Sequence, residues 1–485
     1  MPEGKTNLAE LVYLLYFGVM FGARAAGLYE GETIYSISLV AGALLFVIKL
    51  LLTKHTPAEY AVTVLLLAAG SMVYVRTGEK GLLLYLTLLL GMKGVSLPRV
   101  ERWALTILGV CFPLLNLVTV TGLVKDIAYP ADGRFLFGAL MRRSLGYPYF
   151  NTMFTTYIVL MALIMLCRDQ ASDLLLTSLF LFIIAAWLYI YSASNTGMIV
   201  TLLYLPLNFY LQKKKRLTKA GGWLILLLYP ACLVFSILGP LLIRGGLFTL
   251  MDKVFHNRFT YSRYYLTTEP VTLFGVRFAP GPNDNYYIDS SFLYSFLQIG
   301  IIPCILLTLL MLGTILHLVR ENRRTELAIL VSFCVLGLSD PFFYNLSYKN
   351  LLFLFAAEWF WTGFQRISTR LPDLWRREIC LFPAGSREIV YEDLLPCRIW
   401  RRVSDFLGSV FAKDAVKHFA GFLVTAFVIS TLTVTFTAPG NIAGRVDEPG
   451  EWEVIRAASS VGIWSGIAVM LMLTGMTRRR KKKGS

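Results

Sequence analysis

Long apolar stretches recur along almost the whole of this 485-residue chain, and they limit what it can fold into. About 20 apolar residues in a helix cross a bilayer core of about 30 Å. Lipid offers the backbone no hydrogen-bond partners, so each crossing segment must be a helix that satisfies its own amides. Because 56% of the residues are hydrophobic, the composition argues against a large soluble protein. The sequence therefore predicts an all-α, polytopic integral membrane protein.

We expect about 14 transmembrane helices, placed by hydropathy and by the length that a bilayer requires. Their approximate ranges are 7–25, 34–53, 58–75, 81–95, 103–123, 150–167, 174–192, 195–211, 222–242, 291–318, 327–341, 348–364, 416–436 and 458–476. An even number of crossings places the two termini on the same side of the membrane.

Basic residues gather in short segments between these apolar stretches. The chain carries a net charge of +16, and its basic runs at 213–216, 320–324 and 478–483 fall on one side of the predicted helices. Lysine and arginine are retained on the cytoplasmic side of a membrane, where they also meet anionic lipid headgroups. Both termini are therefore expected in the cytoplasm. Charge in this pattern indicates membrane lipids as partners and no nucleic acid.

The chain divides into three predicted regions. These are a transmembrane core at 1–365 with outer loops at 124–149 and 243–290, a cytoplasmic basic segment at 366–415, and a C-terminal helix pair with a basic tail at 416–485. We expect the middle segment to be amphipathic and to lie on the inner leaflet through Trp375, Trp400 and its arginines. A disordered linker is the alternative for that segment. The helix pair reads as an appendage.

The two outer loops depart from the charge rule, because they carry basic residues on the outside. The first contains Lys125, Arg134, Arg142 and Arg143, and the second contains Arg244, Lys253, Arg258, Arg263 and Arg277 beside Asp252, Glu269, Asp284 and Asp289. A guanidinium group is planar and suits bidentate binding of phosphate oxygens. We therefore interpret the arginines as anion ligands, with a solvated loop of mixed charge as the alternative.

The second outer loop is also rich in aromatic residues. It contains Tyr261, Tyr264, Tyr265, Tyr286 and Tyr287. Tyrosine offers a flat apolar face with a polar tip, which suits contact with a sugar ring. The same residues gather at membrane interfaces for other reasons, so an aromatic belt is the alternative.

Several well-known catalytic patterns are missing from the sequence. It has no P-loop, no GxGxxG, no HExxH, no DxD and no CxxC pair among its seven cysteines. We therefore expect no cofactor, no metal site and no disulfide framework. Of the four histidines, only His256 lies in an outer loop. Chemistry at the outer face must then depend on arginine, tyrosine and aspartate, with His256 as a further candidate.

Five segments carry a resemblance to a known family. They are RRSLGYPYFNT (142–152), SASNTG (192–197), HNRFTYSRYY with a later LFG (256–275), IDSSFLYSFLQIGII (288–302) and GLSDPFFYNLSYKNLLFLF (337–355). In order and spacing they resemble the motifs of bacterial Wzy-type O-antigen and capsular polysaccharide polymerases. The resemblance covers about residues 100–365. It departs from the family pattern at Asn195, where arginine is common, and at Asp340, where glutamate is frequent.

The resemblance implies a GT-C-like membrane glycosyltransferase of the O-antigen ligase and polymerase superfamily. Such an enzyme polymerises undecaprenyl-pyrophosphate-linked oligosaccharide repeat units on the outer face of a bacterial cell membrane, without a metal or a nucleotide sugar. A chain-length regulator protein is an expected partner. The product would be a surface polysaccharide of the cell envelope.

The loop chemistry and the resemblance together give the expected site. Arg258 and Arg263 would bind the donor pyrophosphate, helped by Arg142 or Arg143. The other expected substrate-binding residues are Arg277, Tyr264, Asn151 and Asp340. Asp289 is the first candidate for the general base, and His256 is the second. The alternative role for Asp289 is to cap the following helix at its N-terminus.

Two other functions stay open at this point. A ligase of the same superfamily would transfer a finished glycan to another acceptor, but such ligases resemble His-Asn where this chain has Asp289-Ser290. A flippase for lipid-linked oligosaccharides would share the helix count. It should carry charged residues inside its helices along a path, whereas this sequence concentrates charge in the outer loops.

Overall fold

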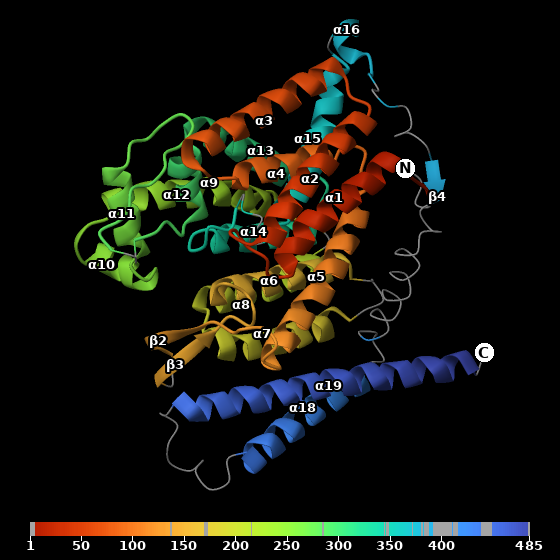
Figure 1. Cartoon of the computed structure of the whole chain (residues 1–485), viewed down its shortest axis with the longest axis vertical. Coiled ribbons are helices and arrows are strands. Elements are labelled where there is room, and N and C mark those ends of the chain that lie inside the picture. The colour runs from red at the N-terminus through yellow and green to blue at the C-terminus, as the bar shows by residue number, and fades with distance from the viewer. Residues whose placement is uncertain are drawn as a thin grey trace. The chain divides into compact units, whose positions relative to one another are not determined.

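The computed structural model describes most of the chain. The described residues are 5–135, 138–168, 173–214, 216–283, 286–343, 345, 349–370, 372–379, 382, 388–390, 410, 416–437 and 449–483. They form two compact units (Figure 1). Unit 1 comprises Met1–Leu108 and Leu202–Ile389, and unit 2 comprises Gly109–Thr201 and Val390–Ser485.

Helices dominate both units. Nine described helices are long and apolar enough to cross a membrane: α1 (Leu8–Ala25), α2 (Thr33–Leu52), α3 (Pro57–Thr77), α5 (Leu97–Val120), α7 (Leu174–Ser192), α9 (Lys219–Leu242), α13 (Ile301–Arg320), α18 (Val416–Thr437) and α19 (Pro449–Lys483). The remaining helices that match predicted spans are α4 (Gly81–Gly91), α6 (Phe150–Leu166), α8 (Asn195–Lys213), α14 (Arg324–Leu336) and α15 (Leu352–Ser368). The protein is thus mostly helical, with many helices suited to a multi-pass membrane protein.

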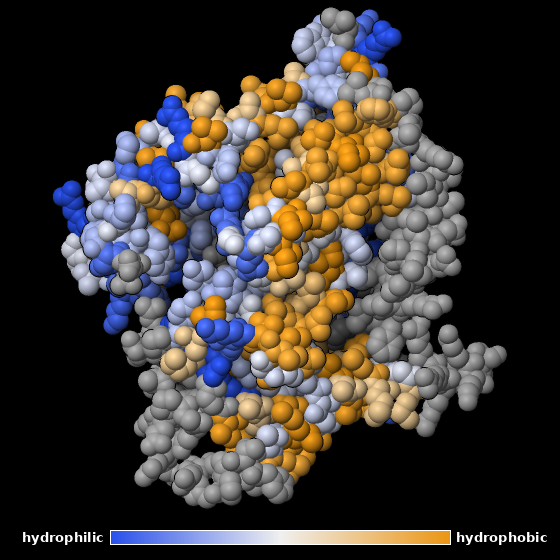
Figure 2. Space-filling model, in the orientation of Figure 1, coloured by the Kyte–Doolittle hydropathy of each residue, from blue (hydrophilic) through white to orange (hydrophobic). Residues whose placement is uncertain are grey.

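The surface of unit 1 fits this assignment. Figure 2 shows a broad apolar surface where Figure 1 places α2 and α3, and a mostly polar surface where it places α10 (Gly245–Val254) and α11 (Arg258–Thr268). Large apolar side chains are exposed along α2 and α3, among them Ile34, Val40 and Leu65. Exposure of such side chains over whole helices is expected where lipid covers them. The loop at 243–290 is partly helical, because it contains α10 and α11.

The tenth predicted span, 291–318, is wrong as a continuous helix. It consists of α12 (Ser291–Tyr294), a π-helical turn at Ser295–Ile299, and α13, which begins after Gly300. Gly300 has a φ of +98°, so the helix cannot continue through it. The loop at 243–290 fills the break, because Ile301 N–H donates to the Thr272 carbonyl at 3.1 Å.

Two further elements differ from the prediction of an all-α chain. The loop at 124–149 contains an antiparallel hairpin of β2 (Ala128–Phe135) and β3 (Gly138–Arg143). A second short sheet joins β1 (Lys5–Asn7) to β4 (Glu388–Val390). The eleventh predicted span, 327–341, also ends early, because α14 stops at Leu336.

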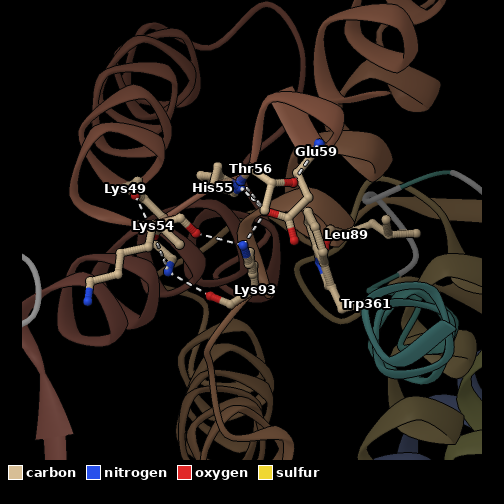
Figure 3. A network of polar contacts seen from close by, with 9 residues as sticks. Lys49, Lys54, His55, Thr56, Glu59, Leu89, Lys93 and Trp361 are labelled. Atoms are coloured by element: carbon tan, nitrogen blue, oxygen red, sulfur yellow. Dashed lines mark hydrogen bonds and ion pairs between the residues drawn. The ribbon is translucent and has the colours of Figure 1, made fainter. Parts of the chain in front are cut away.

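Charged side chains are buried in unit 1 near the turn between α2 and α3 (Figure 3). Lys93 pairs with the Glu59 carboxylate and donates to the Lys54 carbonyl at 2.6 Å. Lys49 donates to the carbonyl of Lys93 at 2.9 Å. The Lys93 ammonium also lies 5.7 Å from the ring centroid of Trp361 in α15. These contacts satisfy charges that would otherwise be costly to bury.

Most of the segment predicted at 366–415 lies outside the described residues, and Trp400 is among those left out. The described part includes α16 (Asp373–Arg376), where Trp375 is 43% exposed. Ile379 pairs with His55 through two backbone hydrogen bonds of 2.8 and 3.1 Å. This part of the segment therefore contacts the α2–α3 turn.

In unit 2, α18 and α19 run side by side (Figure 1). Small residues let the two backbones approach closely. A Cβ placed on Gly466 would lie 2.7 Å from the Phe422 carbonyl oxygen, and one on Gly462 would lie 2.4 Å from that of Ala426. The C-terminal helix pair is therefore a closely packed antiparallel hairpin.

Candidate functional site

Arg258 and Asp289 form a partly buried ion pair in unit 1. Nε and Nη2 of Arg258 lie 2.7 and 2.6 Å from Oδ2 of Asp289. The two side chains are 18% and 15% exposed. Arg258 is the first residue of α11, and Asp289 lies two residues before α12. The folded chain thus brings the predicted anion ligand and the predicted base into direct contact.

Ser290, and not Asp289, caps the helix that follows. The Ser290 hydroxyl accepts a hydrogen bond from Leu293 N–H at 3.5 Å. It also donates to the Ser236 hydroxyl of α9 at 3.2 Å. The alternative role that the sequence left open for Asp289, capping of the helix, is therefore taken by its neighbour. The Asp289 carboxylate is turned toward Arg258 instead.

Asp340 is a second carboxyl group near this ion pair. It lies after the end of α14 and is 3% exposed. Ser291 holds its backbone, because the Ser291 hydroxyl donates to the Asp340 carbonyl at 2.7 Å and accepts from Phe343 N–H at 2.9 Å. Burial raises the pKa of Asp340 to about 8, although the charge of Arg258 works against that rise. Asp340 is thus a carboxylic acid at neutral pH.

The pKa of Asp289 is also raised. Burial is the main cause, and the adjacent Arg258 opposes it through charge and hydrogen bonding. A carboxylate with a raised pKa is a stronger proton acceptor. The cluster therefore combines one guanidinium with one carboxylate and one neutral carboxylic acid.

A tight turn between α10 and α11 sets the direction of Arg258. His256 and Asn257 both have positive φ, at +52° and +66°. Asp252 then accepts from Thr260 N–H at 2.9 Å and from the Thr260 hydroxyl at 2.8 Å, which fixes the first turn of α11. His256 is half-buried in this turn. The predicted second base thus lies two residues before Arg258.

Arg263 binds protein carbonyls. Its Nε donates to the Pro240 carbonyl and its Nη2 to the Ile243 carbonyl, both at 2.6 Å. Its guanidinium also lies 3.9 Å from the ring centroid of Phe248. A cation at these carbonyls stabilises the C-terminal end of α9. Arg277, in contrast, is exposed.

The tyrosines of the loop at 243–290 form one cluster beside α11. Tyr264 lies 5.1 Å from Tyr286 and 5.2 Å from Tyr265, measured between ring centroids. Tyr261 lies 4.7 Å from Tyr286 and 6.0 Å from Tyr287. The Tyr265 hydroxyl donates to the Tyr286 carbonyl at 2.7 Å, which joins α11 to the segment before Asp289. Such ring faces suit the apolar face of a sugar.

Unit 2 holds the predicted residues of the other outer loop. Arg142 is 8% exposed, and its guanidinium lies 4.6 Å from the ring centroid of Phe150. Arg143 pairs with Asp126 at 3.2 Å. The amide oxygen of Asn151 accepts from the Ser194 hydroxyl at 3.0 Å. The motifs at 142–152 and 192–197 therefore meet within unit 2.

No family model, curated protein or solved structure matches this chain. Within the described part of the chain, no three His, Cys, Asp or Glu side chains are grouped to hold a metal ion. Two polar clusters are the candidate sites: Arg258, Asp289 and Asp340 in unit 1, and Arg142, Asn151 and Ser194 in unit 2.

The expected site did not include two buried cations of unit 1. Arg24, in the last turn of α1, is 3% exposed, and Lys349 is fully buried. Both lie near the ring of Tyr29, at 5.1 Å for Arg24 and 5.9 Å for Lys349. Arg24 donates to the Tyr35 hydroxyl at 2.5 Å. A charged side chain in an apolar stretch is costly unless it has specific partners such as these.

Asp340→Asn is expected to raise the melting temperature of the protein at pH 8 by about 5 °C, and to change it little at pH 5. The folded-state pKa of Asp340, about 8, lies above the value of an unfolded chain. The folded state therefore holds its proton more tightly, and stability falls as the pH rises from about 4 to about 8. Asparagine removes this dependence and keeps the neutral shape.

The control is Asp373→Asn, because the Asp373 side chain is 94% exposed. Its melting temperature should differ from wild type equally at both pH values. Thermal unfolding in detergent, followed between pH 5 and pH 8, makes the measurement. A difference between Asp340→Asn and wild type that does not grow with pH would contradict the buried neutral acid.

Proposed function

We propose that the protein is a membrane glycosyltransferase that polymerises undecaprenyl-pyrophosphate-linked oligosaccharide repeat units into a surface polysaccharide. The observation that carries this proposal is the cluster of Arg258, Asp289 and Asp340 beside the tyrosines of the outer loop. Transfer of a glycan from a lipid pyrophosphate to a sugar hydroxyl needs a base for the hydroxyl proton, a cation for the leaving pyrophosphate and aromatic faces for the sugars.

The reaction uses these groups in defined roles. The hydroxyl oxygen of the acceptor sugar attacks the anomeric carbon of the donor, and Asp289 takes the hydroxyl proton. The bond from the anomeric carbon to the pyrophosphate oxygen breaks, and its electron pair leaves with the lipid pyrophosphate. Arg258 keeps Asp289 ionised in the resting site and offers positive charge toward the developing phosphate anion. Asp340, which is neutral at pH 7, can donate a hydrogen bond to a substrate oxygen.

Exchange of a proton at Asp289 balances the cycle. The proton taken from the acceptor passes to solvent or to the leaving pyrophosphate, so the enzyme returns to its starting state. Neither a nucleotide nor a redox partner enters this balance. The glycosidic bond that forms replaces the sugar–phosphate bond that breaks.

The proposal includes an orientation in the membrane. Both termini lie in the cytoplasm, and both polar clusters lie on the outer side. Contacts within each unit support it, because they join segments that the lysine and arginine rule places on one side. Lys49, Lys93 and Glu59 join the predicted inner ends of α2, α3 and α4. Asn151 and Ser194 join the predicted outer ends of α6 and α8. The helices that match the predicted spans would then cross a bacterial cell membrane.

Purified protein in detergent micelles tests the function. A glycosyltransferase is expected to convert a lipid-linked repeat unit into longer glycans and free lipid pyrophosphate without a bilayer. A flippase changes only the sidedness of its substrate, so it would leave the repeat unit chemically intact in micelles. Chromatography of the lipid-linked products separates these outcomes. Glycan that leaves its carrier lipid for a different acceptor would instead indicate the ligase reaction.

A further inference from the structure

Arg456 is buried in a place where a charged side chain is costly. It lies in α19, within the candidate membrane span Val454–Thr477, and is 1% exposed. An arginine inside a membrane helix is rare, and its cost must be offset by specific partners. Its guanidinium therefore indicates a contact on which the local structure depends.

The partners of Arg456 are backbone carbonyls of two other segments of unit 2. Its Nη2 donates to the carbonyl of Met141 in β3, and its Nε donates to the carbonyl of Ile190 in α7 at 3.2 Å. Tyr191 returns the contact, because its hydroxyl donates to the Arg456 carbonyl at 2.9 Å. The guanidinium carbon lies 5.7 Å from the centroid of the Tyr191 ring. One side chain thus joins three elements.

Both acceptors lie next to residues of the polar cluster in unit 2. The Met141 carbonyl belongs to the peptide bond that leads into Arg142, which stacks on Phe150. The Ile190 carbonyl follows Tyr189, whose hydroxyl donates to the Asn195 amide oxygen at 2.8 Å. Restraining these carbonyls restrains the backbone from which the cluster's side chains extend. A guanidinium fork can hold two carbonyls at once, which an ammonium on a flexible stem does less well.

We propose that Arg456 is a positioning residue that holds β3 and the end of α7, and so sets the place of Arg142 for substrate. The C-terminal helix pair is then a working part of the site and not an appendage. The inference rests on the proposed function where it assigns Arg142 to the substrate. The restraint on β3 stands apart from that assignment and has its own readout.

The first arm of the test measures this restraint by amide hydrogen exchange on the full chain. Arg456→Met and Arg456→Lys are compared with Ser459→Ala, which removes a hydroxyl in the same turn of α19 that donates to the Arg456 carbonyl at 2.9 Å. Exchange at 141–145 is expected to speed up at least about tenfold in Arg456→Met, the effect of losing one hydrogen bond from a charged group. Exchange in α18 should stay at its wild-type rate, and Ser459→Ala should match wild type throughout.

The second arm measures transfer from a lipid-linked repeat unit. Arg456→Met is expected to raise the donor KM about tenfold with a smaller change in kcat, and Arg456→Lys to recover part of the loss. In the background of Arg142→Ala, the same Arg456→Met change should add less than about twofold, because the two residues act through one contact.

The two arms separate the failure of the inference from the failure of the proposed function. Wild-type exchange at 141–145 in Arg456→Met would overturn the positioning role, whether or not the protein transfers glycan. The link to substrate would be overturned if Arg456→Met speeds exchange at 141–145 but changes the donor KM as much in the Arg142→Ala background as in wild type. If wild-type protein transfers no glycan, the proposed function fails, and the exchange arm still decides whether Arg456 restrains β3.

Discussion

Asp289→Asn is expected to lower the rate of glycan transfer at least about a thousandfold while the protein still binds its lipid-linked donor. Asparagine has nearly the shape of aspartate but accepts no proton at neutral pH. Because Ser290 caps α12, the loss cannot be explained by a missing helix cap. Turnover of a lipid-linked repeat unit, measured beside donor binding by the same purified protein, tests this expectation.

The single substitution also leaves Arg258 without its carboxylate partner. Breaking a buried ion pair in this way typically costs about 3–5 kcal/mol, so reduced stability would confuse the result. The matched control is the double variant Arg258→Met with Asp289→Leu, which removes both charges together. We expect it to regain stability but to stay inactive. Transfer near the wild-type rate by this double variant would show that the ion pair is only structural.

Gly300→Ala is expected to destabilise unit 1 strongly. Gly300 has φ +98° and ψ +169°, a backbone region that is essentially restricted to glycine. A Cβ there would lie 2.2 Å from the Gly275 nitrogen and 2.7 Å from the Leu273 carbonyl oxygen, so backbone must move. Strain and overpacking together predict a loss of about 2–6 kcal/mol.

We expect this strain to disturb the cluster of Arg258 and Asp289. The segment at 272–275 pairs with the helix break and lies between Tyr265 and Tyr286 in the chain. We expect a lower melting temperature, faster hydrogen exchange at Ile301 and Ile302, and loss of transfer. Gly363→Ala is the matched control, since nothing lies within 4 Å of a Cβ at that position of α15. A Gly300→Ala protein with wild-type melting and exchange would contradict the loop-filled break.

The helices were predictable because a bilayer-length apolar stretch has few other solutions. The break at Gly300 was not, because it is stabilised by carbonyls of Thr272 and Leu273, which lie far back in the sequence. A glycine in an apolar run carries no local sign that another segment will pair with it. The hairpin of β2 and β3 was missed for the same reason, since its pairing depends on residues across a turn and not on local hydropathy.

Individual residues of the candidate site were predictable from the sequence, but the contacts between them were not. Arg258 and Asp289 stood out because they lie in a charged loop that the sequence predicts on the outer side of a membrane, where basic residues are uncommon. Their pairing joins positions that are 31 residues apart, which no spacing rule could show. Arg263 illustrates the limit most clearly. It was expected to bind phosphate, but its donors lie on the carbonyls of Pro240 and Ile243, and only folding determines which acceptors are near.

The position of bound donor tests whether Arg258 and Asp289 form the site of glycan transfer. A lipid-linked repeat unit with a photoreactive diazirine on the sugar next to the pyrophosphate would be crosslinked to the purified protein, and the labelled peptides would be sequenced. The account predicts labelling within 255–294, around Arg258 and Asp289, that unmodified donor suppresses. Suppressible labelling confined to other segments, such as α2 and α3, would contradict it.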